Sequence, residues 1–341
     1  QAEGALCSCP VTAEALTGAL HALAQQGISP FGVYVTSPDY LGGVQDIPAL
    51  AAVCRAQGVP LLVDNAHGAY LRFLPQNCHP IAQGAAMCCD SAHKTLPVVT
   101  GGAYLHLAHD APVQDDAAVR GALALFGSTS PSYLILQSLD ACNAVLAEDY
   151  PRRLAQCCAA LEGVRNSLNK AAAARQCPVP LAVAGAQQEP MKLTLDAAAL
   201  GCTGTALAEE LRRAQMECEY ADPRYVVLMF TPENPPQDFE RLQTALEQLL
   251  AAVPANLPRP ENRAGEFAAL QQQAVQRCTI RQAVLGAQVR IPVHKALGRV
   301  CAMPTVSCPP AIPVAVSGEE ITPAAIALMQ RYGIEELSVL R

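Results

Sequence analysis

The first 150 residues alternate short apolar runs with longer segments in which apolar residues recur every three or four positions. The apolar runs, which predict β-strands, cover residues 31–36, 60–63, 85–90 and 103–107. The longer segments, which predict helices, cover residues 12–26, 46–57, 114–125 and 132–147. Strands separated by helices of this length favour a parallel sheet with right-handed crossovers. We therefore predict an α/β fold with a mostly parallel sheet and flanking helices.

The rest of the chain predicts two further units, because 341 residues suffice for two or three domains. The second unit, residues 151–253, is predicted to be a small α+β domain, with helices at 152–175, 205–215 and 236–253 and strands at 192–196, 218–221 and 225–231. A stiff proline-rich linker, residues 254–260, follows it. The third unit, residues 260–341, is also predicted to be α+β, with helices at 261–274 and 322–332 and a strand at 312–316. The first domain then covers residues 1–150.

Composition excludes several classes of partner. The net charge is −7, Trp is absent and aromatic residues make up 4%, so no nucleic-acid partner is expected. No apolar run reaches the roughly 18 residues of a membrane span, so no membrane partner is expected. The 15 cysteines fall largely within apolar runs, which indicates a reduced, cytoplasmic protein. The one metal-like spacing, Cys7-Ser8-Cys9 with His21, lacks a second ligand pair, and we predict no metal site.

Two charged residues follow neighbouring predicted strands. Asp64 ends the apolar run 60–63, and Lys94 follows the run 85–90. Because ligands bind beyond the carboxyl ends of parallel strands, both side chains are expected at one rim of the sheet. Pyridoxal phosphate (PLP) requires a lysine that forms a Schiff base and an aspartate that keeps its pyridine nitrogen protonated. The pairing therefore predicts a PLP site, with Lys94 and Asp64 as catalytic and cofactor-binding residues.

The residues around this pair predict the rest of the site. A small side chain at Ala66 would let the flat ring approach, and the hydroxyl of Ser91 is suited to the phosphate. His67 and His93 flank the site, and each is either a structural histidine or a group that touches the cofactor. A hydroxyl-rich turn before the 132–147 helix suits a phosphate and equally suits a helix N-cap. Its members are Ser128, Thr129 and Ser130.

Four motifs together resemble the Orn/Lys/Arg decarboxylase family. They are Ser-Pro-Asp-Tyr-Leu-Gly at 37–42, Asp-Asn-Ala-His-Gly-Ala at 64–69, Ser-Ala-His-Lys-Thr-Leu at 91–96 and Ser-Thr-Ser-Pro-Ser-Tyr at 128–133. Pro-Pro-Ala-Ile-Pro at 309–313, with Ser-Gly-Glu at 317–319, resembles the C-terminal domain of the family. The resemblance runs over the whole chain and is strongest over residues 33–140.

This resemblance implies a fold type I PLP enzyme of the aspartate-aminotransferase superfamily. It implies that Lys94 forms the Schiff base and that Asp64 binds the pyridine nitrogen. It also implies that Ala66 lies under the ring and that Ser91 and His93 lie near the phosphate. His93 is also expected to be catalytic. The 128–130 turn would serve the cofactor of a neighbouring subunit, so a homodimer or higher oligomer is implied. The family's N-terminal part, which carries a phosphate-binding loop, is expected to be absent, and we interpret the chain as the C-terminal two-thirds of such an enzyme.

The implied reaction removes CO₂ from arginine, lysine or ornithine and yields the corresponding amine, a step of polyamine metabolism. A long cationic substrate needs an acidic partner, for which Glu261 and Glu319 are the sequence candidates. Two alternatives stay open. One is another fold type I PLP enzyme, an aminotransferase or a lyase, because Asp64 and Lys94 are common to all of these. The other is a non-catalytic truncated paralogue that acts as a structural or regulatory subunit.

Overall fold

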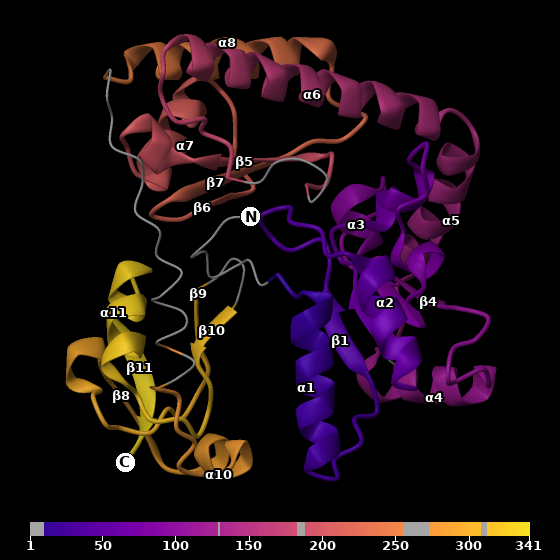
Figure 1. Ribbon diagram of the computed structural model, residues 1–341, viewed down its shortest axis with the longest axis vertical. Coiled ribbons are helices and arrows are strands. Elements are labelled where there is room, and N and C mark those ends of the chain that lie inside the picture. The colour runs from indigo at the N-terminus through magenta and orange to yellow at the C-terminus, as the bar shows by residue number, and fades with distance from the viewer. Residues whose placement is uncertain (1–9, 129, 183–187, 255–269, 271–272, 308–311) are drawn as a thin grey trace.

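The computed structural model describes residues 10–128, 130–182, 188–254, 270, 273–307 and 312–341. Figure 1 shows three groups of elements, each built around its own sheet or sheets. The N-terminal group occupies the right of the view, the long helices α6 and α8 run along the top, and the C-terminal group lies at the lower left. The boundaries predicted for three separate domains remain predictions.

A four-stranded sheet lies at the centre of the N-terminal group. Its strands, in spatial order, are β1 (Val33–Thr36), β2 (Leu61–Asp64), β3 (Met87–Asp90) and β4 (Tyr104–Leu107). The first three are parallel, which confirms the predicted α/β class. The expectation of parallel crossovers was wrong for β4, which pairs antiparallel with β3. Only the short helix α3 (Ala92–Thr95) separates β3 from β4, and parallel pairing requires a longer crossover, usually a full helix.

Two helices cover one face of this sheet. They are α1 (Ala13–Gln25), capped by Thr12, and α2 (Ile47–Ala56), capped by Asp46. Leucines of both helices pack against Val35, Leu61 and Val63 of the strands in one buried cluster. The remaining short elements of this group are the 3₁₀ helices η1 (Ala69–Phe73) and η2 (Pro80–Gln83) and the helices α4 (Asp116–Phe126) and α5 (Tyr133–Ala147). The 3₁₀ helix η2 packs against α2.

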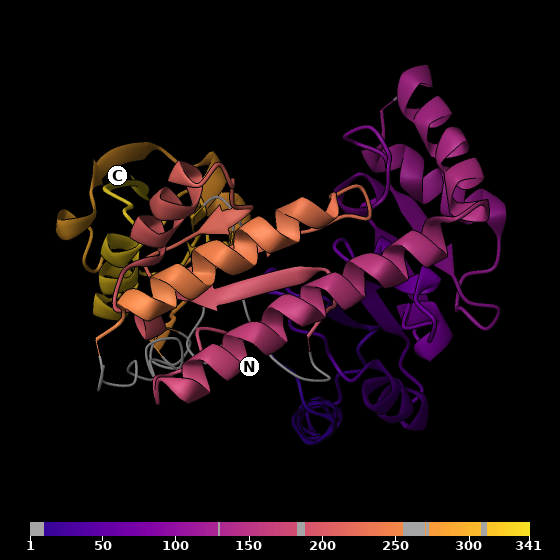
Figure 2. The ribbon, with the colours of Figure 1, turned by 90° about the horizontal axis from the view of Figure 1, so that it is seen from above.

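The second group is a three-stranded antiparallel sheet covered by helices. Its elements are α6 (Tyr150–Ala174), β5 (Lys192–Asp196), η4 (Ala197–Leu200), α7 (Gly204–Arg213), β6 (Tyr220–Ala221), β7 (Tyr225–Met229) and α8 (Pro236–Ala252), with strand order β5-β7-β6. The long helices α6 and α8 pack against each other over the sheet, as Figure 2 shows from above. One buried apolar cluster extends from Ala69 to Leu246, so the first two groups share a core.

The C-terminal group holds two small antiparallel sheets. Its elements are α10 (Ile280–Leu285), β8 (Gln288–Pro292), η5 (Val293–Lys295), β9 (Thr305–Ser307), β10 (Ile312–Ala315), α11 (Pro323–Arg331) and β11 (Glu336–Leu340). The pairs β8–β11 and β9–β10 form the sheets. The predicted strand at 312–316 and helix at 322–332 correspond to β10 and α11. Most of the predicted helix 261–274 and of the linker 254–260 lies outside the described residues.

Two further findings concern the described part of the chain. None of its helices combines the length and the apolarity that a membrane-spanning segment needs. Its cysteines are unpaired, and Cys54, Cys142, Cys157 and Cys301 are buried in apolar clusters. These four therefore pack as small hydrophobic residues, as the sequence predicted.

The shared core gives a stability prediction. Leu161 of α6 is fully buried in the cluster that joins the first two groups. Leu161→Ala leaves a cavity, and we expect it to lower the free energy of unfolding by about 2–5 kcal/mol. Urea denaturation measures this loss. Asn169→Ala, an exposed change on the same helix, is the control and should stay within about 0.5 kcal/mol of the parent; equal losses in both variants would contradict the shared core.

Candidate active site

The carboxyl end of β2 fixes the carboxylate of Asp64. Its Oδ1 accepts a hydrogen bond from the backbone N–H of Ala66 at 3.1 Å. Its Oδ2 accepts one from the hydroxyl of Tyr34, at 3.2 Å, which projects from the neighbouring strand β1. An Asx turn and one cross-strand bond thus orient the carboxylate at the rim of the sheet.

Lys94 approaches the same rim from α3, which follows β3 directly. Its Nζ lies 3.2 Å from Nε2 of His67, to which it can donate a hydrogen bond. Burial, assisted by the charges of Lys192 and Lys94, lowers the pKa of His67 to about 2, so this imidazole is neutral at physiological pH. A neutral ring that accepts at Nε2 carries its proton on Nδ1. That buried Nδ1 has no hydrogen-bond partner among the described residues and is therefore available to a ligand.

The surroundings of Lys94 favour its uncharged form. Burial lowers the pKa of Lys94, and the nearby charge of Lys192 lowers it further. The carboxylates of Asp64 and Glu219 act in the opposite direction, but the net shift is downward. A lysine must be uncharged to attack a carbonyl group, so this environment activates Lys94 as a nucleophile.

This shift predicts how the reactivity of Lys94 depends on pH. Because its pKa is lowered, the uncharged amine should be present at a lower pH than in an ordinary lysine, whose pKa is about 10.4. When the chain is treated with PLP and borohydride over a pH series, labelling of Lys94 should reach half its maximum at a lower pH than labelling of exposed Lys170 on α6. Peptide mapping by mass spectrometry gives both curves. Parallel curves would contradict the prediction.

Four further residues surround the predicted pair, and three of them, Glu189, Lys192 and Glu219, come from distant parts of the chain and were not predicted from sequence. The ring of Tyr40 packs edge-on against His67 at 5.2 Å between centroids, and its hydroxyl donates to Glu219 at 3.0 Å. Buried Lys192 of β5 lies near Lys94 and His67, since its charge affects the pKa of both. Glu189 forms an ion pair with Lys192 at 2.9 Å. No spacing pattern links Glu189, Lys192 and Glu219 to Lys94, and only the packing of the second group on the first brings them here.

The other predicted site residues have varied positions. Ser91 is the residue before α3, and Ala66 is half-buried beside Asp64. His93 Nδ1 lies 2.9 Å from the carbonyl oxygen of Gly102, to which it can donate, so the ring is anchored to the segment before β4. Ser128 and Ser130 are exposed, and the N–H of Ser130 donates to Oγ of Ser128. Among the described residues no hydrogen bond joins this turn to Lys94, and Thr129 lies outside those residues.

A family comparison agrees with this geometry. The model of the Orn/Lys/Arg decarboxylase major domain matches residues 7–188, more than half of the chain. The chain therefore belongs to the Orn/Lys/Arg decarboxylase family, and the resemblance inferred from its motifs is confirmed.

Individual relatives share sequence and fold. The arginine decarboxylase of Bacillus subtilis is 27% identical over 297 residues, which cover 85% of this chain and 59% of the relative. The uncharacterised protein YaaO of the same organism is 29% identical over 310 residues, covering 88% of this chain and 61% of YaaO. The constitutive lysine decarboxylase of E. coli has a similar structure, with a TM-score of 0.69 at 16% identity over 97% of this chain and 61% of that one. The chain thus spans about three-fifths of the length of these proteins.

The residues present fit PLP. Asp64 offers an oriented carboxylate, Lys94 an amine with a lowered pKa, and His67 a buried nitrogen without a partner. The first two are the groups that the pyridine nitrogen and the aldehyde of the cofactor require. They lie at the carboxyl ends of adjacent parallel strands, where α/β sheets bind their ligands.

Proposed function

We propose that this chain carries the catalytic residues for PLP-dependent decarboxylation of a basic amino acid. The observation that supports this most directly is the placement of Asp64 and Lys94 at the ends of β2 and β3, with His67 in contact with Lys94. Arginine, lysine and ornithine are the proposed substrates. This choice rests on the family and on relatives named arginine decarboxylase and lysine decarboxylase.

Bound PLP would supply an electron sink for the pair of electrons left on the α-carbon as CO₂ departs. Asp64 would accept the N–H of the pyridine ring and hold its proton there, because Tyr34 and Ala66 fix its carboxylate. Lys94 would attach the cofactor and afterwards return a proton to the α-carbon. Neutral His67 would orient the amine of Lys94 through the bond to Nε2.

The cationic end of the substrate needs a negative partner. Glu219 suits this role, since it is exposed and its charge reaches Lys94. Of the two sequence candidates, Glu261 lies outside the described residues, and the carboxylate of Glu319 accepts the N–H of Val316 in the C-terminal group. Among the described acidic residues we therefore propose Glu219, in preference to Glu319.

The test of this function begins with the chain itself and added PLP. We expect an absorption band of bound cofactor, a borohydride-fixed adduct that maps to Lys94, and CO₂ release from arginine, lysine or ornithine. Release of CO₂ without consumption of a keto acid would exclude the aminotransferase alternative. An adduct scattered over surface lysines, with no CO₂ from any of the three substrates, would refute the proposal for this chain and favour the non-catalytic alternative.

We also propose a cytoplasmic location for the protein. The unpaired cysteines of the described residues support it, because a reducing compartment keeps thiols free.

We also propose that the protein acts as a homodimer through the surface formed by α4 and α5. Large apolar side chains on this surface flank the 128–130 turn and are exposed, with Phe126 at 92%, Tyr133 at 85% and Leu125 at 79%. Monomeric proteins rarely leave large apolar patches open to water, and side chains this exposed on two successive helices favour a partner that covers them. A second copy that covers this patch would bring the turn close to a neighbouring cofactor site, as the resemblance implies.

A charge in this surface should weaken the dimer. Phe126→Asp places a carboxylate where an aromatic anchor would be buried, and we expect the dissociation constant to rise by about thirtyfold or more. Sedimentation velocity over a concentration series measures the change. Phe31→Asp is the matched control, since Phe31 is equally exposed but lies outside α4 and α5. Equal weakening by both changes, or none by Phe126→Asp, would refute the proposed surface.

A further inference from the structure

A second cluster of chemically active side chains lies on the other face of the same strands. Side chains alternate along a strand, so Cys88 and Asp90 of β3 point to the face opposite to Cys89, the register partner of Asp64. His106 of β4 is directly across from Cys88 in the antiparallel register. Cys88 and Asp90 are buried, and His106 is half-buried.

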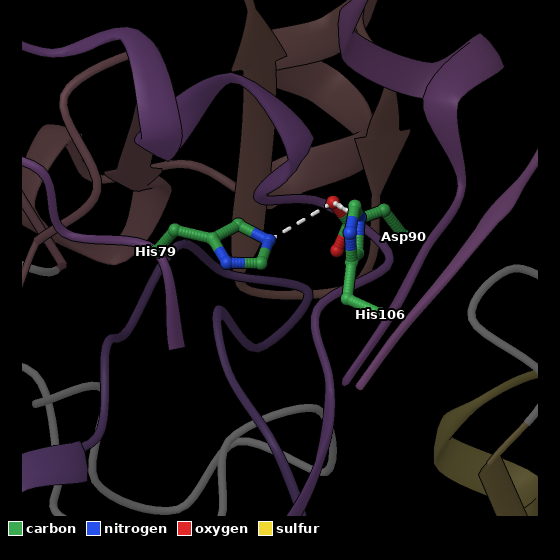
Figure 3. Close-up of side chains that lie close together, drawn as sticks. All are labelled: His79, Asp90 and His106. Carbon is green, nitrogen blue, oxygen red and sulfur yellow. Dashed lines mark hydrogen bonds and ion pairs between the residues drawn. The ribbon is translucent and has the colours of Figure 1, made fainter. Parts of the chain in front are cut away.

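His79 completes the cluster from the loop before η2. Its Nε2 lies 3.1 Å from Oδ2 of Asp90, and Nε2 of His106 lies 3.0 Å from the same oxygen. Figure 3 shows both rings directed at this carboxylate. The Sγ atom of Cys88 lies 3.9 Å from Nε2 of His79 and 3.3 Å from Oδ1 of Asp90. Three groups of the types that bind transition metals therefore lie together, with their ligand atoms within 4.8 Å of one another, and the thiol of Cys88 lies beside two of them.

We propose that His79, Asp90 and His106 bind one divalent transition metal ion of the zinc type, with Cys88 as the fourth ligand. The donor separations suit this. Nitrogen and oxygen ligands lie about 2.0–2.1 Å from a tetrahedral zinc ion, which places them roughly 3.3 Å from one another. The measured separations of 3.0 and 3.1 Å come close to this value without rearrangement of the strands.

The charges of the four groups also suit a divalent cation. Asp90 is 3% exposed, and its hydrogen-bonding partners in the described part of the chain (Asn65, His79, Cys88 and His106) carry no fixed positive charge. A buried carboxylate is stable only when paired or coordinated. A bound divalent ion, which deprotonates a coordinating thiol, would be neutralised by the carboxylate of Asp90 and the thiolate of Cys88. The occupied cluster would then carry no net charge.

The surroundings supply the orientation and access that a metal site needs. The amide of Asn65 donates to Oδ1 of Asp90 at 2.8 Å, and the N–H of Ile81 donates to Nδ1 of His79 at 3.4 Å. The first bond fixes the carboxylate, and coordination through Nε2 of His79 would place the ring proton on Nδ1, in place of the bond accepted from Ile81. A cavity of about 580 Å³, lined in part by His79, Asp90 and His106, gives an ion a route from solvent.

The test titrates the full chain, stripped of metal and free of PLP, with Zn²⁺ by calorimetry and with Co²⁺ by absorption. We expect one tight site per chain and a thiolate-to-cobalt charge-transfer band. His106→Ala should weaken Zn²⁺ binding by about a hundredfold or more, because it removes a ligand from a half-exposed position where the fold tolerates the change. His109→Ala, an exposed histidine just after β4, should leave the affinity unchanged.

The cysteine variants give a readout that does not depend on affinity. Cys88→Ser should remove the charge-transfer band, whereas Cys142→Ser, at another buried free cysteine, should retain it. A parent chain that binds Zn²⁺ no more tightly than His106→Ala would overturn the proposal and leave a metal-free hydrogen-bonded cluster. A band that survives in Cys88→Ser would overturn the assignment of the fourth ligand. Because PLP is absent, neither result depends on the proposed decarboxylase function.

Discussion

Lys94→Ala is expected to abolish the borohydride-fixed PLP adduct and to reduce CO₂ release by a factor on the order of 10⁴ or more, the scale of loss when a covalent catalyst is removed. The physical reason is that Lys94 offers an amine with a lowered pKa at the rim of the sheet, in contact with His67. Mass mapping of the adduct and release of labelled CO₂ measure the two effects separately.

Lys170→Ala serves as the control for this variant. Lys170 is exposed on α6, so its removal should change neither the adduct nor the rate. Circular dichroism establishes whether Lys94→Ala remains folded, which separates lost chemistry from lost structure. A folded Lys94→Ala chain with an unchanged rate would show that another group performs the reaction.

The second large effect is expected at the buried ion pair beneath the site. The side chains of Lys192 and Glu189 are each 1% exposed, and their charged atoms lie 2.9 Å apart. The hydroxyl of Tyr70 donates to the second oxygen of Glu189 at 2.5 Å. Lys192→Met removes the cation and leaves a buried carboxylate without its partner, so we expect a loss of about 3–5 kcal/mol in the free energy of unfolding.

Two comparisons isolate this cause. The double variant Glu189→Gln with Lys192→Met carries no unpaired charge and keeps a polar partner for Tyr70, so it should lose less stability than Lys192→Met alone. Lys170→Met, at an exposed lysine, should change stability by no more than about 0.5 kcal/mol. Urea denaturation measures the free energy of unfolding of all three variants. A Lys192→Met chain as stable as Lys170→Met would refute the expected contribution of this ion pair to stability.

The sequence predicted the elements that position the proposed cofactor site. The runs that end near Asp64 and Lys94 are the parallel strands β2 and β3 of the structure. Their placement at one rim follows from parallel pairing alone, which explains why local patterns sufficed. The order of the strands was not predicted: α2 separates β1 from β2, but only two short 3₁₀ helices lie between β2 and β3.

The sequence did not predict features that depend on pairing between distant segments. The antiparallel direction of β4 and the pairing of β8 with β11 are examples. The 288–292 strand lies more than forty residues from its partner, and its burial is intermediate along most of its length, so its apolar pattern is weak. Such strands are recognised only from the neighbour that completes their hydrogen bonds.

The sequence by itself determined the α/β class, the family and the two residues, Asp64 and Lys94, on which the proposed chemistry rests, because these depend on periodicity and on short motifs. Only the tertiary structure decided which distant side chains surround them. Lys192 and Glu219 approach Lys94 from the second group. The prediction of no metal site rested on the spacing of ligands along the sequence, and His79, Asp90 and His106 do not follow such a spacing. Their proximity arises from strand register and from the loop before η2, which no local pattern in the chain records.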